Sequence, residues 1–215
     1  MDLISAFFIG LVSGIVASFL MIYAYEQETK PLLEVGTEDA PAFSSKAAAC
    51  FYHLVVRQKK PALFLFSWTS RRPAWSCKAT YKVYDRDRKS KLIDTFQCRW
   101  PSAPEPLIPW RDEANNIIFI PDFSRLFLGR KTDIFYHEPQ ALDLVLKREG
   151  ETECYVFTNE CYLEGGFDYR GDRFKLNRGE YQMLVSIYYE TETLNAWFRL
   201  ENFGTSRDSV KVTKI

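Results

Sequence analysis

The chain opens on its longest apolar segment. Leu3–Tyr25 runs for 23 residues without a charged side chain, and about 20 apolar residues in an α-helix cross the hydrocarbon core of a bilayer. Because backbone groups in lipid must bond within their own segment, we expect this run to be helical. Tyr23 and Tyr25 lie at its C-terminal end, where amphipathic aromatic side chains favour the headgroup layer. The pattern predicts a single transmembrane helix over residues 3–25.

A cleaved secretory signal is the main alternative for this segment. Such signals combine a basic start, an apolar stretch of about 7–15 residues and a small-x-small cleavage site. Only Met1 and Asp2 precede the apolar run, and Ile22–Ala24 does not match a cleavage site. We therefore expect a retained membrane anchor.

Small residues recur at every fourth position of the expected helix. These residues are Ala6, Gly10, Gly14 and Ser18. Positions four apart lie on one helix face, and small side chains there let a second helix approach closely. The spacing predicts a homo-oligomer or a partner transmembrane helix. The alternative is that small residues are simply common in membrane helices.

Charge and cysteine content bear on the side of the membrane. No lysine or arginine precedes the helix, whereas Lys30 follows it closely, and cationic residues are retained on the cytoplasmic side. The chain has five cysteines, an odd number that cannot all pair within it, and they lack the tight spacing of a disulfide framework. Both observations favour a single-pass protein of the cell membrane with its domain in the cytoplasm.

The remaining chain alternates short apolar runs with turn residues. In Cys77–Tyr84, for example, apolar and polar side chains alternate with the period of two that is typical of a half-buried strand. No long amphipathic helix separates these runs, so we expect an all-β antiparallel sandwich over residues 50–215. Residues 26–49 are expected to form a tether, with a short strand at Leu32–Val35. The other candidate strands are Cys50–Arg57, Leu63–Trp68, Trp75–Tyr84, Leu92–Cys98, Ile117–Ile120, Ala141–Lys147, Glu153–Phe157, Tyr181–Tyr189, Ala196–Phe203 and Val210–Ile215.

Three stretches carry a resemblance to a known class of sandwich. Leu176–Tyr181 places a tyrosine after a glycine turn at the start of an apolar strand, which resembles the tyrosine corner of immunoglobulin-like domains. Arg72–Cys77 and Phe198–Gly204 are similar to stretches of prokaryotic membrane-anchored immunoglobulin-like modules of the CARDB type. The resemblance implies a binding or scaffold module and carries no catalytic residues. Met183 stands where the second bridging cysteine of antibody domains would be, so no central disulfide is implied.

No recognisable catalytic, cofactor or metal motif is present. Cys50 and His53 have a ligand-like spacing, but on a strand they point to opposite faces, and none of the cysteines forms a Cys-x-x-Cys pair. The chain also lacks a phosphate-binding loop and a nucleophile elbow. We expect a non-enzymatic protein without metal or cofactor. A cysteine–histidine pair brought together only by folding would instead make it a membrane-bound hydrolase.

Basic residues concentrate in one part of the expected domain. Arg57–Lys91 contains eleven lysine and arginine residues against two acids. Within it, cations flank an apolar, aromatic segment that is suited to a membrane interface or a protein partner. The candidate contact residues are Lys59, Lys60, Phe64, Phe66, Trp68, Arg71 and Arg72. In the alternative interpretation Leu63–Trp68 is a buried core strand. Contact with nucleic acid is disfavoured, because the formal net charge of the whole chain is zero.

A proline-rich segment, Pro101–Pro109, precedes Trp110. It is either a rigid connection between two sheets or a docking surface beside an exposed tryptophan. Taken together, the sequence favours a membrane-anchored binding or scaffold module that recognises a protein partner or the membrane surface. The rivals are the hydrolase above and an oligomerising sensor or effector that acts through its transmembrane helix.

Overall fold

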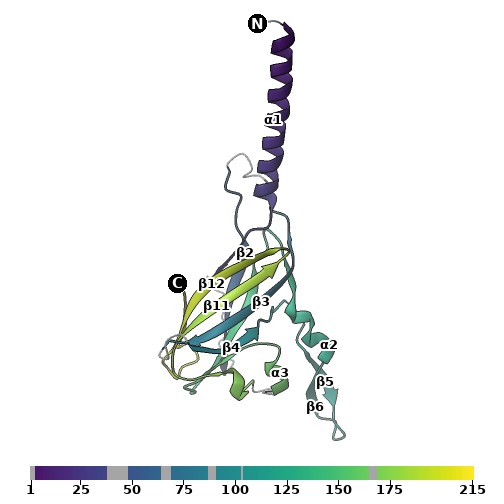
Figure 1. The fold of residues 1–215 in the computed structure, drawn as a ribbon. Coiled ribbons are helices and arrows are strands. Elements are labelled where there is room, and N and C mark those ends of the chain that lie inside the picture. The colour runs from purple at the N-terminus through teal and green to yellow at the C-terminus, as the bar shows by residue number, and fades with distance from the viewer. Residues whose placement is uncertain (1–2, 38–47, 64–68, 87–90, 103, 165–168) are drawn as a thin grey trace.

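The computed structural model describes residues 3–37, 48–63, 69–86, 91–102, 104–164 and 169–215. A long helix stands at one end of two antiparallel sheets that face each other (Figure 1). One sheet has the strand order β1-β2-β8-β9-β10, and the other has the order β13-β12-β11-β3-β4 with β7 beside β3. The helices are α1 (Leu3–Thr29), α2 (Phe123–Leu126), η2 (Leu128–Arg130), α3 (Cys161–Glu164) and η4 (Asp172–Phe174). The strands are β1 (Leu33–Gly36), β2 (Ala49–Gln58), β3 (Ala74–Asp85), β4 (Lys91–Gln97), β5 (Leu107–Arg111), β6 (Ile117–Pro121), β7 (Thr132–Ile134), β8 (Gln140–Arg148), β9 (Cys154–Val156), β10 (Lys175–Leu176), β11 (Gly179–Tyr189), β12 (Glu192–Asn202) and β13 (Val210–Lys214). The predicted fold class, an antiparallel β-sandwich preceded by one N-terminal helix, is confirmed.

The main core lies between the two sheets. On β3 the side chains of Cys77, Ala79, Tyr81 and Val83 are fully buried, and they are the face that the alternation predicted. Strand β11 pairs with β3 in the same sheet, and its inward-facing apolar side chains are buried in the same core. Removing these apolar side chains from water is the main free-energy gain that holds the sheets together.

The expected tyrosine corner has its hydrogen bond. The Tyr181 hydroxyl donates to the carbonyl of Asn177 at 2.9 Å, so the start of β11 is tied back to the turn before it. A separate hydrogen bond joins the two sheets: the buried Lys147 ammonium on β8 donates to Asn202 Oδ1 on β12 at 2.8 Å.

Helix α1 continues past the apolar run to Thr29, and only three residues separate it from β1. It is long and apolar enough to cross a membrane, and none of that apolar stretch is buried in the rest of the protein. The interval 26–49, expected to be a tether, therefore holds the end of α1 and a strand of the sandwich, while residues 38–47 lie outside the described residues. The expected short strand at Leu32–Val35 corresponds to β1.

The proline-rich segment Pro101–Pro109 leads into a short ribbon. Pro109 lies within β5, which among the described residues pairs with β6 alone to form a two-stranded ribbon. A proline is tolerated there because one side of each strand has no ladder partner. Figure 1 shows this ribbon extending from the sandwich on the side away from α1. The end of the segment, Leu107–Pro109, is therefore part of a projecting element, and the neighbouring Trp110 is exposed there.

Candidate functional site

Arg71 joins the end of α1 to the sandwich. Its buried guanidinium donates hydrogen bonds to four backbone carbonyls. Two of them belong to Glu28 and Lys30 at the end of the helix, and two belong to Lys59 and Lys60 after β2. Cations stabilise the carbonyl end of a helix, and here the same group also binds the loop after β2. Helix and sandwich are therefore connected by side-chain bonds as well as by the chain.

The predicted contact residues differ in their exposure to solvent. Arg71 was predicted to face a membrane or partner, but its side chain is only 4% exposed and its donors are taken up internally, so that prediction is wrong for this residue. Lys59, Lys60 and Arg72 are exposed around the end of α1. The predicted aromatic contacts Phe64, Phe66 and Trp68, with most of the candidate strand Leu63–Trp68, lie outside the described residues.

The small-residue face of α1 forms a shallow groove. Gly10, Gly14 and Ser18 line it together with Leu11, Ile15, Phe19 and Ile22. A Cβ atom added at either glycine would meet nothing within 4 Å, and the Ser18 hydroxyl donates to the Gly14 carbonyl at 2.8 Å. The remaining predicted residue, Ala6, lies on the same helix towards its N-terminus. The groove is open and its polar group is already bonded.

A β-bulge creates a polar site on the outer face of the sheet that contains β2 and β8. Tyr52 lies opposite Val145, whereas the next residue, His53, lies opposite Asp143, so Leu144 is the extra residue. Because a bulge shifts the alternation of side chains by one, Asp143 points outward beside His53. The Leu144 carbonyl is not left unbonded, since it accepts from the Phe157 amide at 3.0 Å and from the Tyr81 hydroxyl at 3.2 Å.

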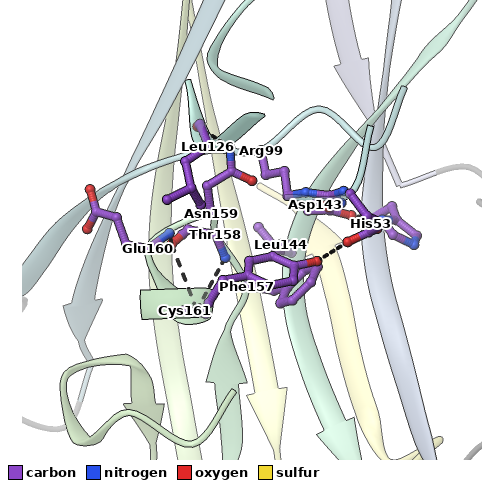
Figure 2. Close-up of polar contacts among 12 residues, drawn as sticks. His53, Arg99, Leu126, Asp143, Leu144, Phe157, Thr158, Asn159, Glu160 and Cys161 are labelled. Atoms are coloured by element: carbon purple, nitrogen blue, oxygen red, sulfur yellow. Dashed lines mark hydrogen bonds and ion pairs between the residues drawn. The ribbon is translucent and has the colours of Figure 1, made fainter. Parts of the chain in front are cut away.

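A chain of polar contacts runs across this outer face. His53 Nδ1 lies 2.7 Å from Asp143 Oδ1, without the alignment of a hydrogen bond. The other oxygen of Asp143 accepts from Arg99 Nη1 at 2.7 Å, and Arg99 Nη2 donates to Glu105 Oε1 at 2.8 Å. The second oxygen of Glu105 accepts from the Tyr162 hydroxyl. Figure 2 shows Arg99, Asp143 and His53 side by side, to the right of Asn159. Five polar side chains from distant parts of the chain thus form one network.

A cavity of about 320 Å³ adjoins the network. Aromatic side chains make much of its wall, and the Arg99 guanidinium lies over the rings of Phe157 and Tyr162 at 5.8 and 5.9 Å from their centres. Its lining residues are Phe51, His53, Arg99, Pro101, Glu105, Asp143, Phe157, Tyr162 and Tyr169. A largely apolar hollow with a few fixed polar groups is the usual form of a small-molecule site.

The thiols near the network are not poised for nucleophilic chemistry. Burial raises the pKa of Cys161 to about 12. Its Sγ accepts from the Thr158 amide (Figure 2) and donates to the Val156 carbonyl at 3.0 Å. Burial likewise raises the pKa of Cys77 and of Cys154 to about 12. Since the thiolate is the nucleophilic form, these cysteines are inert at neutral pH. All five cysteines are free and buried.

Comparison with known proteins adds no relative. No protein-family model matches the chain, and no curated protein or solved structure shows significant similarity to it. Within the described residues, no group of three or more histidine, cysteine, aspartate or glutamate side chains is placed to hold a metal ion.

Sequence patterns pointed to one member of the network and gave no sign of the network itself. His53 was considered as a partner of Cys50, but Asp143 and Arg99 were not singled out. The available signal was a charged residue in the middle of an apolar run, Ala141–Lys147, because a buried carboxylate requires a partner. The identity of that partner depends on the fold.

Proposed function

We propose that this chain is a single-pass, membrane-anchored binding module without enzymatic activity, which holds its sandwich against the anionic surface of the bilayer. The observation that carries the proposal is the set of four hydrogen bonds that Arg71 donates to the end of α1 and to the loop after β2, which we call the Arg71 junction. It fixes the sandwich to the end of α1 and so keeps the loop after β2 at the level where the helix leaves the membrane.

The charges at this level support an anionic partner. We call Lys30, Lys59, Lys60 and Arg72 the basic rim; all four are exposed. Of the two nearby acids on α1, Glu28 accepts a hydrogen bond from the Ala62 amide at 2.6 Å, which leaves Glu26 as an exposed acid. Each cation near an anionic leaflet contributes about 1 kcal/mol of binding free energy. An anionic surface also agrees with placement of the domain in the cytoplasm.

An exposed aromatic pair lies beside the basic rim. Trp75 and Phe135 stack edge to face with ring centres 5.8 Å apart, and both are exposed. They sit close to the junction because Gln58 Nε2, at the end of β2, donates to the carbonyls of Ile134 and Arg72. Aromatic side chains of this kind favour the interface between water and lipid.

A fluorophore at the rim tests the proposal. The full-length variant Ser70→Cys can be labelled selectively, since Ser70 is exposed and all native thiols are buried. In nanodiscs that contain phosphatidylserine we expect a blue shift in the emission of the label. The shift should disappear at high salt, and also when Lys59→Glu and Lys60→Glu are combined with Ser70→Cys. The matched control Lys211→Glu changes an exposed cation on β13 and should keep the shift. Equal emission in neutral and anionic bilayers would overturn the proposal.

A second candidate function, self-assembly, is favoured by the projecting ribbon. We define the apolar arm as β5, β6, α2 and η2. Its large exposed apolar side chains are Trp110, Ile117, Ile118, Phe119, Phe123, Phe127 and Leu128. Monomeric proteins rarely expose a continuous apolar surface above a few hundred Å², and a lone two-stranded ribbon is at best marginally stable.

We propose a second copy of this chain as the partner of the apolar arm. Anchored copies share one orientation, so their arms lie at the same height above the membrane. A standard interface buries about 800 Å² of each partner, and the exposed aromatic and aliphatic side chains of the apolar arm would form its apolar centre. This mode would add to any pairing through the groove on α1.

Cross-linking tests self-assembly through the arm. In membranes, Ile118→Cys should give a disulfide-linked dimer under mild oxidation, whereas Lys211→Cys on β13 should not. The dimer should persist when Gly10→Ile and Gly14→Ile disrupt the helix groove, and it should disappear when Trp110→Ser is added. If Ile118→Cys stays monomeric under these conditions, self-assembly through the arm is wrong.

A further inference from the structure

The carboxylate of Glu105 is bound as a ligand would be. Its two oxygens accept from Arg99 Nη2 and from the Tyr162 hydroxyl, and both of these donors belong to buried side chains. The side chain of Glu105 itself is 60% exposed, against 3% for Arg99 and 1% for Asp143. A mostly exposed residue therefore places only its charged end in a buried site.

The two carboxylates on Arg99 are held very differently. Asp143 stands on the bulge of β8, and its backbone amide also donates to the Arg99 carbonyl at 3.0 Å. Glu105 lies in the segment between β4 and β5 and approaches from the solvent side. The Asp143 contact is part of the fold, whereas the Glu105 contact can be exchanged without exposing the core.

The adjoining cavity would receive the body of a ligand whose carboxylate replaced that of Glu105. Phe51, Phe157, Tyr162 and Tyr169 line it, and the rings of Phe157, Tyr162 and Tyr169 contact one another edge to face or tilted at 5.0–5.9 Å. Flat apolar groups pack well against such rings. The volume of about 320 Å³ is at the small end of ligand sites.

We propose that Arg99 and Tyr162 form a binding site for a small aromatic monocarboxylate, which Glu105 occupies in the absence of ligand. Arg99 presents a planar pair of donors that suits a carboxylate, and its stacking on Phe157 and Tyr162 fixes that plane. Exchange of one carboxylate for another keeps the charge beside Asp143 unchanged. A phosphate dianion would add a negative charge next to a buried aspartate, so the site selects against it.

Glu105 is then an internal competitor. A tethered group acts at an effective concentration in the millimolar range, and the apparent affinity of an external ligand falls with the fraction of molecules in which the site is open. Neutralising Glu105 should therefore strengthen ligand binding. A purely structural role of Glu105 predicts no gain.

Benzoate is the probe for the test, with the full-length protein in detergent micelles and calorimetry as the readout. We expect Glu105→Gln to lower the Kd for benzoate at least tenfold, and Glu105→Ala to do the same. Adding Tyr162→Phe to Glu105→Gln should remove most of this gain. Benzamide, the neutral analogue, should bind weakly to every variant, and inorganic phosphate should not displace benzoate.

The matched control is Glu113→Gln, which neutralises an exposed carboxylate on the turn between β5 and β6. It should leave the benzoate affinity unchanged. The proposal fails if Glu105→Gln and Glu105→Ala bind benzoate no better than the natural chain. It also fails if benzamide binds as tightly as benzoate, or if Glu113→Gln gives the same gain.

Discussion

The Arg71 guanidinium lies 2.8 Å from the carbonyl oxygen of Glu28, although 43 residues separate the two in the chain. A hydrogen bond that involves a charged group contributes about 1.5–3 kcal/mol to stability, and the contributions of several bonds made by one side chain do not simply add. We therefore expect Arg71→Ala to lower the free energy of unfolding by about 3 kcal/mol, measured by denaturant titration in detergent.

Hydrogen exchange gives this prediction a local readout. The Arg72 amide donates to Thr29 and the Lys59 amide donates to Leu32 across the same junction. Both amides should lose protection in Arg71→Ala. Arg72→Ala changes an exposed neighbour and should stay within about 0.5 kcal/mol of the natural chain. Unchanged protection in Arg71→Ala would contradict the role assigned to the junction.

The buried carboxylate of Asp143 should be costly to remove. Asp143→Ala leaves the buried Arg99 with the carboxylate of Glu105 as its remaining ionic partner, and breaking a buried ion pair by removing one member costs about 3–5 kcal/mol. Replacing the whole pair in Arg99→Met/Asp143→Leu should recover much of that loss. As a surface comparison, Asp94→Ala breaks an exposed ion pair with Arg173 and should cost less than about 1 kcal/mol. Thermal denaturation of the four proteins checks the order.

The hydroxyl of Tyr181 offers a conservative test of the turn before β11. Tyr181→Phe removes the donor to the Asn177 carbonyl and keeps the ring in the core, so it should cost about 1 kcal/mol. Tyr188→Phe alters an exposed tyrosine of the same strand and should be close to neutral. An equal loss in the two variants would show that the corner bond is not specific.

The buried thiols predict a loss of stability at alkaline pH. Burial raises the pKa of Cys154 from 9.0 to about 12 in the folded protein, so the folded state holds this proton more tightly than the unfolded state does. The contribution is complete below about pH 9 and is lost as pH rises towards 12. Within that window each such thiol lowers the free energy of unfolding by up to about 1.4 kcal/mol per pH unit.

Comparison with Cys154→Ala isolates this effect. The substitution changes packing equally at all pH values, but it removes one titrating group, so its free energy of unfolding should fall less steeply between pH 9 and 11. An identical slope for the two proteins would show that Cys154 does not titrate in this way. Ellman's reagent at pH 8 should detect almost no reactive thiol until denaturant is added.

Local patterns were sufficient for much of the fold. The period of two in Cys77–Tyr84 identified the buried face of β3, because successive side chains of a strand must point to opposite sides. The length of the apolar run identified α1, since helix geometry and bilayer thickness set that length. The resemblance of Leu176–Tyr181 to a tyrosine corner agrees with the hydrogen bond from the Tyr181 hydroxyl to the Asn177 carbonyl.

Local patterns were insufficient wherever partners come from distant segments. The bulge at Leu144 shifts the alternation of β8 by one residue, and nothing near it in the sequence marks the shift. The proline-rich segment gave no sign of a projecting ribbon, because its pairing with β6 depends on where the chain turns back. Arg71 appeared to belong to an exposed basic cluster, and its burial could not be read from its neighbours.

The sequence by itself determined an apolar helix followed by an antiparallel sandwich, because side-chain periodicity and helix length are properties of adjacent residues. Only the tertiary structure decided that Arg71 fixes the helix to the sandwich and that Glu105 occupies the Arg99–Tyr162 site. The physical reason is that a buried charge is stable only with partners, and folding alone brings those partners into reach.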